Sequence, residues 1–98
     1  MILKFKHRNL QRLAEDASYS GSYSPSVITS FRKKIQIIEA ATDERDLYGL
    51  KSLHFEKLKG DRKGQYSIRL NKQWRLILSM VKDKNNKIVL VISIEDYH

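Results

Sequence analysis

The chain has 98 residues, 41% of them hydrophobic and 31% charged, enough for the core of one domain over residues 1–98 and too apolar for a disordered tail. Lysine and arginine exceed aspartate and glutamate by 19 to 11, and the net charge of +8 favours a polyanionic partner. The absence of cysteine excludes a disulfide scaffold, thiolate zinc sites and a cysteine nucleophile. The longest apolar run, Ile88–Ile92, is too short to cross a bilayer, and Lys4 and Lys6 interrupt any signal-peptide core, so we expect a cytoplasmic protein without membrane association.

The first 24 residues predict a strand, a short helix and a loop. Residues 2–6 alternate between apolar side chains and lysines, a pattern typical of an edge strand. Residues 8–17 place apolar side chains at the spacing of an amphipathic helix. Residues 18–24, Ser-Tyr-Ser-Gly-Ser-Tyr-Ser, have no periodicity and predict a loop.

A longer helix is predicted from Pro25 to about Ala41. Ser24 supplies a capping residue and proline suits the first helical position. Its apolar spacing predicts one buried face, and we expect the opposite face to expose three polar side chains, those of Arg32, Lys33 and Gln36. A short helical turn should follow, capped by residues 42–44 and ended by Gly49.

The second half of the chain has the two-residue period of β-strands. Residues 53–58 alternate, and residues 66–71, 74–81 and 88–94 predict three further strands joined by turns. The last of these is nearly all apolar, as in a central strand. The order of strand, two helices and then antiparallel strands predicts an α+β fold with both helices packed on one face of the sheet.

The excess positive charge is concentrated in residues 51–75. This segment holds eight basic and two acidic side chains, a net charge of +6. Such a cluster is expected of a surface that contacts phosphates, although a solvated strand face would also account for it. The basic side chains are those of Lys51, Lys57, Lys59, Arg62, Lys63, Arg69, Lys72 and Arg75.

Two arginines are predicted to face each other across one hairpin. If residues 71–73 form the turn, Leu70 pairs with Trp74 and Arg69 lies opposite Arg75. Two neighbouring guanidinium groups repel unless an anion lies between them, and a phosphate can accept bidentate hydrogen bonds from each. Alternatively, each arginine pairs with a carboxylate such as Glu56 or Glu95.

His54 and Glu56 are predicted to share one face of the strand at residues 53–58, about 7 Å apart. They could act as general acid and base, or form a surface pair without a role. The chain ends in a carboxylate, a phenol and an imidazole, those of Asp96, Tyr97 and His98. The three histidines lack the spacing of metal ligands, so no metal site is expected.

Several separated motifs then suggest a family. They are Leu58–Gly64 (Leu-Lys-Gly-Asp-Arg-Lys-Gly), Tyr66–Asn71 (Tyr-Ser-Ile-Arg-Leu-Asn), Gln73–Leu76 (Gln-Trp-Arg-Leu) and the terminal Asp96–His98. In order and spacing they resemble the HigB-like toxins of the RelE superfamily. The resemblance covers nearly the whole chain, because the N-terminal strand and helices fit the same family.

The resemblance implies a RelE-like fold and the toxin half of a type II toxin–antitoxin pair. The implied activity is ribosome-dependent cleavage of mRNA, without metal or other cofactor, in which the 2′-hydroxyl of the RNA is the nucleophile. Arg75, with Arg69 nearby, would stabilise charge on the phosphate, and Asp96, Tyr97 and His98 would position the nucleotide and transfer protons. Basic side chains of the 57–72 segment would contact RNA phosphates, namely Lys57, Lys59, Arg62, Lys63, Arg69 and Lys72.

The sequence departs from the family pattern at one active-site position. Some members place a histidine two residues before the leucine that opens the Leu-Lys-Gly-Asp motif, whereas this chain has Glu56 there and His54 two residues earlier. Either His54 or Glu56 is therefore expected to take that role, or the protein is a slower nuclease.

The resemblance also implies partners. These are a helix-turn-helix antitoxin of the HigA type, the ribosome with its mRNA, and operator DNA only through the toxin–antitoxin complex. Two other functions stay open from the sequence. One is a non-catalytic module that binds RNA or DNA, and the other is a degenerate toxin that retains only transcriptional autoregulation.

Overall fold

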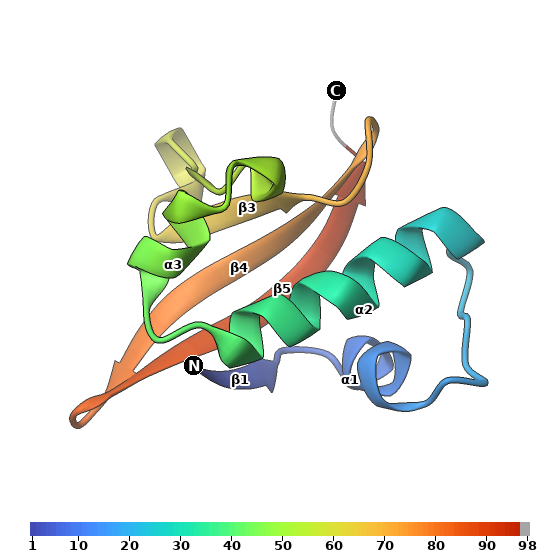
Figure 1. The fold of residues 1–98 in the computed structure, drawn as a ribbon, viewed down its shortest axis with the longest axis horizontal. Coiled ribbons are helices and arrows are strands. Elements are labelled where there is room, and N and C mark those ends of the chain that lie inside the picture. The colour runs from blue at the N-terminus through green and yellow to red at the C-terminus, as the bar shows by residue number, and fades with distance from the viewer. Residues whose placement is uncertain (97–98) are drawn as a thin grey trace.

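Five strands form one sheet in the order β1-β5-β4-β3-β2 in the computed structural model, which describes residues 1–96 (Figure 1). The strands are β1 Ile2–Phe5, β2 Glu56–Lys57, β3 Gln65–Arg69, β4 Trp74–Asp83 and β5 Asn86–Asp96. Strands β2 to β5 pair antiparallel, as predicted, and β1 adds in parallel to β5 at one edge. A parallel neighbour needs a crossover connection, which the helices between β1 and the later strands provide.

Three helices lie between the first strand and the second. They are α1 Arg8–Glu15, α2 Pro25–Ala40 and α3 Glu44–Gly49. The predicted start of α2 is confirmed, with Ser24 at the N-cap position and proline in the first turn, but the Ser24 side chain makes no capping hydrogen bond to the helix. The predicted short turn is confirmed as α3, where a carboxylate oxygen of Asp43 accepts from the Arg45 amide at 2.9 Å. None of the helices within residues 1–96 has the length and apolarity to span a membrane.

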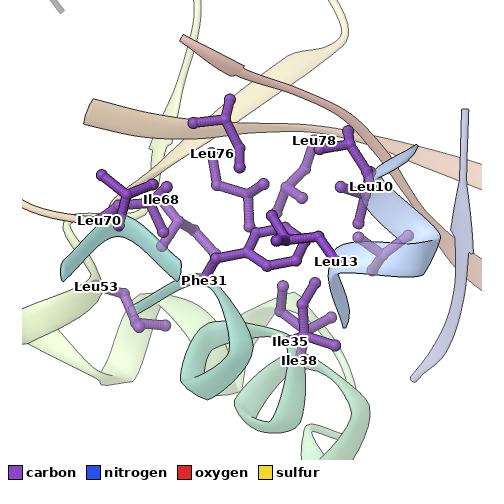
Figure 2. Close-up of a cluster of buried hydrophobic side chains, with 14 of the residues drawn as sticks. Leu10, Leu13, Phe31, Ile35, Ile38, Leu53, Ile68, Leu70, Leu76 and Leu78 are labelled. Atoms are coloured by element: carbon purple, nitrogen blue, oxygen red, sulfur yellow. The ribbon is translucent and has the colours of Figure 1, made fainter. Parts of the chain in front are cut away.

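The core lies between α1, α2 and one face of the sheet, as predicted. Phe31 of α2 is fully buried and lies between Leu13 of α1 and Leu76 of β4 (Figure 2). Removing a phenylalanine side chain of this size from water contributes about 2–3 kcal/mol to folding. Leu78, Val89 and Val91 of the central strands complete the same layer, all with no exposed area.

Arg32 of α2 was predicted on the exposed face of the helix, and this prediction is wrong. Its guanidinium donates to three carbonyl oxygens at the end of α1 and beyond, those of Leu13 at 2.9 Å, Asp16 at 3.1 Å and Tyr19 at 2.9 Å. The last carbonyls of a helix have no partner within it, so a neighbouring arginine can satisfy them. Arg32 therefore joins α1 to α2.

The other face of the sheet carries no α-helix of the described chain, although the loop beside it contains the 3₁₀ turn Gly60–Arg62, and we call it the helix-free face. One irregularity decides which β5 residues lie on it. Ile77 pairs with Ser93 but Leu78 pairs with Val91, so Ile92 is an extra residue in β5. Such a β-bulge interrupts the alternation of side chains. Beyond it, Glu95 lies opposite Arg75 on the helix-free face.

The predicted strand over residues 53–58 is mostly wrong. Residues 51–53 form a 3₁₀ turn, and His54 follows with a left-handed backbone, φ 48°. Only Glu56 and Lys57 pair with β3. His54 and Glu56 therefore do not share a strand face, because the chain turns sharply between the buried side chains of Leu53 and Phe55.

Candidate active site

The β3–β4 hairpin presents two arginines side by side. Arg69 pairs with Arg75 in the register of the strands, and the Leu70 amide donates to the Trp74 carbonyl at 2.9 Å, which confirms the predicted pairing. The Asn71 side-chain oxygen accepts from the amides of Gln73 and Trp74, both at 2.8 Å. These hydrogen bonds fix a short turn, so both guanidinium groups extend from the helix-free face.

Arg75 is largely enclosed, with 12% of its side chain exposed. Its Nη1 lies 3.3 Å from the His54 carbonyl oxygen and 3.4 Å from Ser67 Oγ, and its Nη2 lies 4.0 Å from a carboxylate oxygen of Glu56. The predicted alternative, an arginine beside Glu56, is therefore present for Arg75. Strand β2 is what brings Glu56 there, since Glu56 pairs with Ser67.

Arg69 lies beside the imidazole of His54. Its Nη1 is 3.5 Å from His54 Nε2, and its Nε donates to the Asn71 carbonyl at 3.3 Å. Because the guanidinium can only donate, Nε2 is the acceptor in this contact. The left-handed backbone at His54 thus places its ring near one arginine and its carbonyl near the other. A positive φ is uncommon outside glycine, although histidine adopts it more often than most residues, and such backbone strain is concentrated at functional sites.

Asp96 stands at the end of β5, opposite Trp74. One of its carboxylate oxygens accepts from the Gln73 side-chain amide at 3.0 Å. The turn that orders the two arginines therefore also holds Asp96. The other two predicted residues of the terminal triplet, Tyr97 and His98, lie outside the described residues.

A hollow of about 270 Å³ lies on the helix-free face beside these groups. It is lined by Leu58, Lys59, Arg62, Ser67, Arg75, Ile77, Glu95 and Asp96. One wall is an ion pair that the sequence did not predict. Arg62 donates from both terminal nitrogens to the two oxygens of Glu95, each at 2.6 Å, and Ser93 Oγ donates to Glu95 at 2.6 Å.

This ion pair affects both partners. Hydrogen bonding from Arg62 lowers the pKa of Glu95 below its usual range, with Ser93 adding to the effect and burial opposing it. Glu95 in turn raises the pKa of Arg62. Glu95 was expected as a possible partner of Arg69 or Arg75, and no local signal in the sequence pointed to Arg62, 33 residues away.

The predicted RNA-binding lysines are exposed. Within residues 1–96, no ion pair involves Lys57, Lys59, Lys63 or Lys72. In the same part of the chain, no cluster of three histidine, aspartate or glutamate side chains is arranged to hold a metal ion. The site thus offers arginines, lysines, an imidazole and carboxylates, a set suited to binding a phosphate and transferring protons.

Residues 3–98 match the model of the HigB-like toxins, described as the RelE-like toxin of the type II toxin–antitoxin system HigB. The chain belongs to this family. As the toxin of a type II system, it has an antitoxin as its partner.

Similar proteins agree with this assignment. The chain is 38% identical over 81 residues to Toxin HigB-1 of Vibrio cholerae, an alignment that covers 83% of this chain and 85% of that protein. It is 32% identical over 102 residues to Endoribonuclease HigB of Proteus vulgaris, with both chains fully covered. The solved YoeB/ParE toxin from Agrobacterium tumefaciens shares the fold with a TM-score of 0.57 at 16% identity, over the whole of both chains. The predicted RelE-like α+β fold is confirmed.

Proposed function

We propose that this HigB-like toxin is an endoribonuclease that cuts mRNA on the ribosome. The observation that carries the proposal is the pairing of Arg69 with Arg75 on one hairpin, with His54, Glu56 and Asp96 beside it. The full-length similarity to a relative named Endoribonuclease HigB supports the same activity.

The proposed reaction uses the 2′-hydroxyl of the RNA as nucleophile. The 2′-oxygen forms a bond to the adjacent phosphorus while the bond to the 5′-oxygen breaks. The proton of the 2′-hydroxyl passes to a base on the protein, and an acid on the protein gives a proton to the leaving 5′-oxygen. Arg75 and Arg69 stabilise the negative charge that develops on the phosphate oxygens. The groups available for the proton transfers are His54, Glu56, Asp96, Tyr97 and His98.

Exposed lysines of residues 57–72, of which Lys59 lines the hollow, support binding of an RNA backbone. In this proposal Lys57, Lys59, Lys63 and Lys72 contact phosphates of messenger or ribosomal RNA. The antitoxin is a helix-turn-helix protein of the HigA type, operator DNA is bound only through the toxin–antitoxin complex, and the toxin acts in the cytoplasm without metal or cofactor.

The test is to map mRNA 5′ ends after brief induction, with the message translated or kept off ribosomes. We expect new ends within translated messages, and none when the same message is not translated. Arg75→Ala and His98→Ala should each remove these ends and relieve growth arrest, with circular dichroism showing that the variants are folded. Lys82→Ala, which removes one exposed positive charge at the opposite end of β4 from Arg75, is the matched control and should cut normally.

Two results would contradict the proposal. Binding to RNA that weakens with salt, without any cut ends, would indicate a non-catalytic module. Cut ends that persist in untranslated message would contradict ribosome dependence.

A further inference from the structure

The loop at residues 58–64 reaches across three strands of the sheet. It connects β2 to β3, yet Arg62 in this loop binds Glu95 of β5, with β3 and β4 in between. This contact explains why Ile77 and Ser67 are buried, at 3% and 2% exposed area, although they lie on the helix-free face. The loop covers them and forms a wall of the hollow.

Few other contacts hold this loop in place. The Leu58 amide donates to the Gln65 carbonyl at 2.9 Å and the Lys63 amide to the Gly60 carbonyl at 3.2 Å, both within the loop and its base. Gly60 and Gly64 have positive φ angles of 68° and 87°, and glycines at such positions lose much conformational freedom on ordering. From β4, Ser79 Oγ donates to the Gly64 carbonyl at 3.4 Å, at the end of the loop. The Arg62–Glu95 pair joins the middle of the loop to β5, 33 residues away.

The geometry of the Arg62–Glu95 pair is better suited to fixing the position of the loop than to stabilising the fold. Two parallel hydrogen bonds between a guanidinium and a carboxylate fix the relative position of both side chains. The side chains are 41% and 36% exposed, and solvent screening makes such a pair a weak source of folding free energy. Its effect is therefore expected on the position of the loop.

We propose that Glu95 is a positioning residue that holds the 58–64 loop over the helix-free face through its ion pair with Arg62, which we call the latch. In this proposal Arg62 does not contact RNA. Lys59 and Lys63, carried by the latched loop, are then the cations that meet the substrate backbone. This inference rests on the proposed function and assigns Arg62 a different role from the one predicted from the sequence. A loop that is already ordered loses little conformational freedom when RNA binds, and this favours affinity for RNA.

Glu95→Gln distinguishes the two roles of Arg62, because they predict opposite signs. If Arg62 contacts RNA, removing Glu95 releases a cation and adds a positive charge, so RNA should bind more tightly. If Glu95 latches the loop, KM for ribosome-bound mRNA should rise about 5-fold while kcat stays within about 2-fold, since the cations on the loop lose their position. Glu39→Gln at the end of α2 makes the same charge change away from the loop and should leave KM as it is.

The double variant Arg62→Glu/Glu95→Arg keeps the net charge and exchanges the two partners. A latch predicts that it restores much of the affinity lost in Glu95→Gln, because the pair can form again with reversed orientation. Arg62→Glu without the second change should raise KM further than Glu95→Gln does.

Amide hydrogen exchange gives a readout that does not depend on RNA cleavage. Exchange of the Lys63 amide and its loop neighbours should accelerate in Glu95→Gln, while exchange in α2 stays unchanged. Tighter RNA binding, or faster exchange with an unchanged KM, would overturn the positioning role. If wild-type protein cuts no RNA, the proposed function fails, and exchange still reports whether the latch exists.

Discussion

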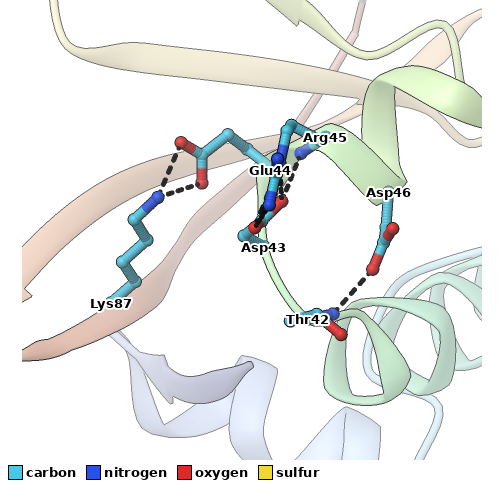
Figure 3. A network of polar contacts seen from close by, with 6 residues as sticks. All are labelled: Thr42, Asp43, Glu44, Arg45, Asp46 and Lys87. Atoms are coloured by element: carbon cyan, nitrogen blue, oxygen red, sulfur yellow. Dashed lines mark hydrogen bonds and ion pairs between the residues drawn. The ribbon is translucent and has the colours of Figure 1, made fainter.

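Two charged regions of the molecule are built differently, the first turn of α3 and the candidate active site. At α3 the side chains are matched: Asp43 with Arg45 at 2.8 Å, Glu44 with Lys87 at 2.9 Å, and Asp46 with the Thr42 amide at 2.8 Å (Figure 3). In the candidate active site, the seven basic side chains of residues 57–75 outnumber the four carboxylates, those of Glu56, Asp61, Glu95 and Asp96.

The difference separates charges that shape the chain from charges that can bind a ligand. Matched charges at α3 cap a short helix and tie it to β5, and they leave little net field. An excess of cations on one surface attracts a polyanion. Within the site, the Arg62–Glu95 pair resembles the α3 arrangement, which is why we assign it to positioning.

The largest expected contrast is between Arg69→Gln and Arg45→Gln, the same chemical change in the two regions. Arg69→Gln should lower cleavage of ribosome-bound mRNA about 10–100-fold, because a cation beside the reacting phosphate is lost. Arg45→Gln should leave cleavage unchanged and lower the melting temperature slightly. Single-turnover cleavage and thermal unfolding of both variants measure this contrast. Equal cleavage by both variants would mean that the hairpin arginine has no role in the reaction.

A second pair of variants compares His54 with Lys84. In the described chain these are the two non-glycine residues with a positive φ, 48° for His54 and 55° for Lys84. Replacing either by glycine relieves the backbone and should raise the free energy of unfolding by up to about 1 kcal/mol. Cleavage should fall only in His54→Gly, since Lys84 lies at the far hairpin between β4 and β5. Thermal unfolding and cleavage rates of both variants test this. Normal cleavage by His54→Gly would remove the imidazole from the mechanism.

The smallest expected effect is the pH dependence of the α3 cap. Hydrogen bonding from Arg45 holds the pKa of Asp43 at about 2, below its ordinary 3.8. A lowered carboxylate pKa adds stability that is complete above the ordinary value and is lost as the pH falls toward 2. Asp43→Asn, which keeps a capping oxygen, should melt a few degrees below wild type at pH 7, with the gap closing between pH 4 and pH 2. A gap that stays constant with pH would mean that the charge contributes nothing.

Much of the fold followed from periodicity in the sequence. The edge strand, the start of α2 at Pro25 and the facing pair of Arg69 and Arg75 were predictable, because each depends on neighbouring residues or on one short turn. The parallel pairing of β1 with β5 was not, since it joins segments about 86 residues apart.

For the candidate site, the sequence indicated residues that the structure brings together, but not the geometry in which they meet. His54 was expected on a strand, but the left-handed turn has no sequence signature in a histidine. Leu53 and Phe55 alternate as strand residues do, yet both are buried by a turn. Arg32 and Arg62 were expected to be free for solvent or RNA, and each is bound by groups distant in the chain.

Because of the extra residue in β5, odd-numbered residues face the core before Ile92 and even-numbered residues face it afterwards. Before Ile92, odd-numbered residues such as Val89 and Val91 belong to the core, and after it an even-numbered residue, Ile94, does. Deleting Ile92 would therefore restore an unbroken alternation, with Val91 and Ile94 still in the apolar layer and Ser93 and Glu95 still on the other face. A relative without the bulge should accordingly align here with a one-residue gap and keep the same side chains on each face of its sheet.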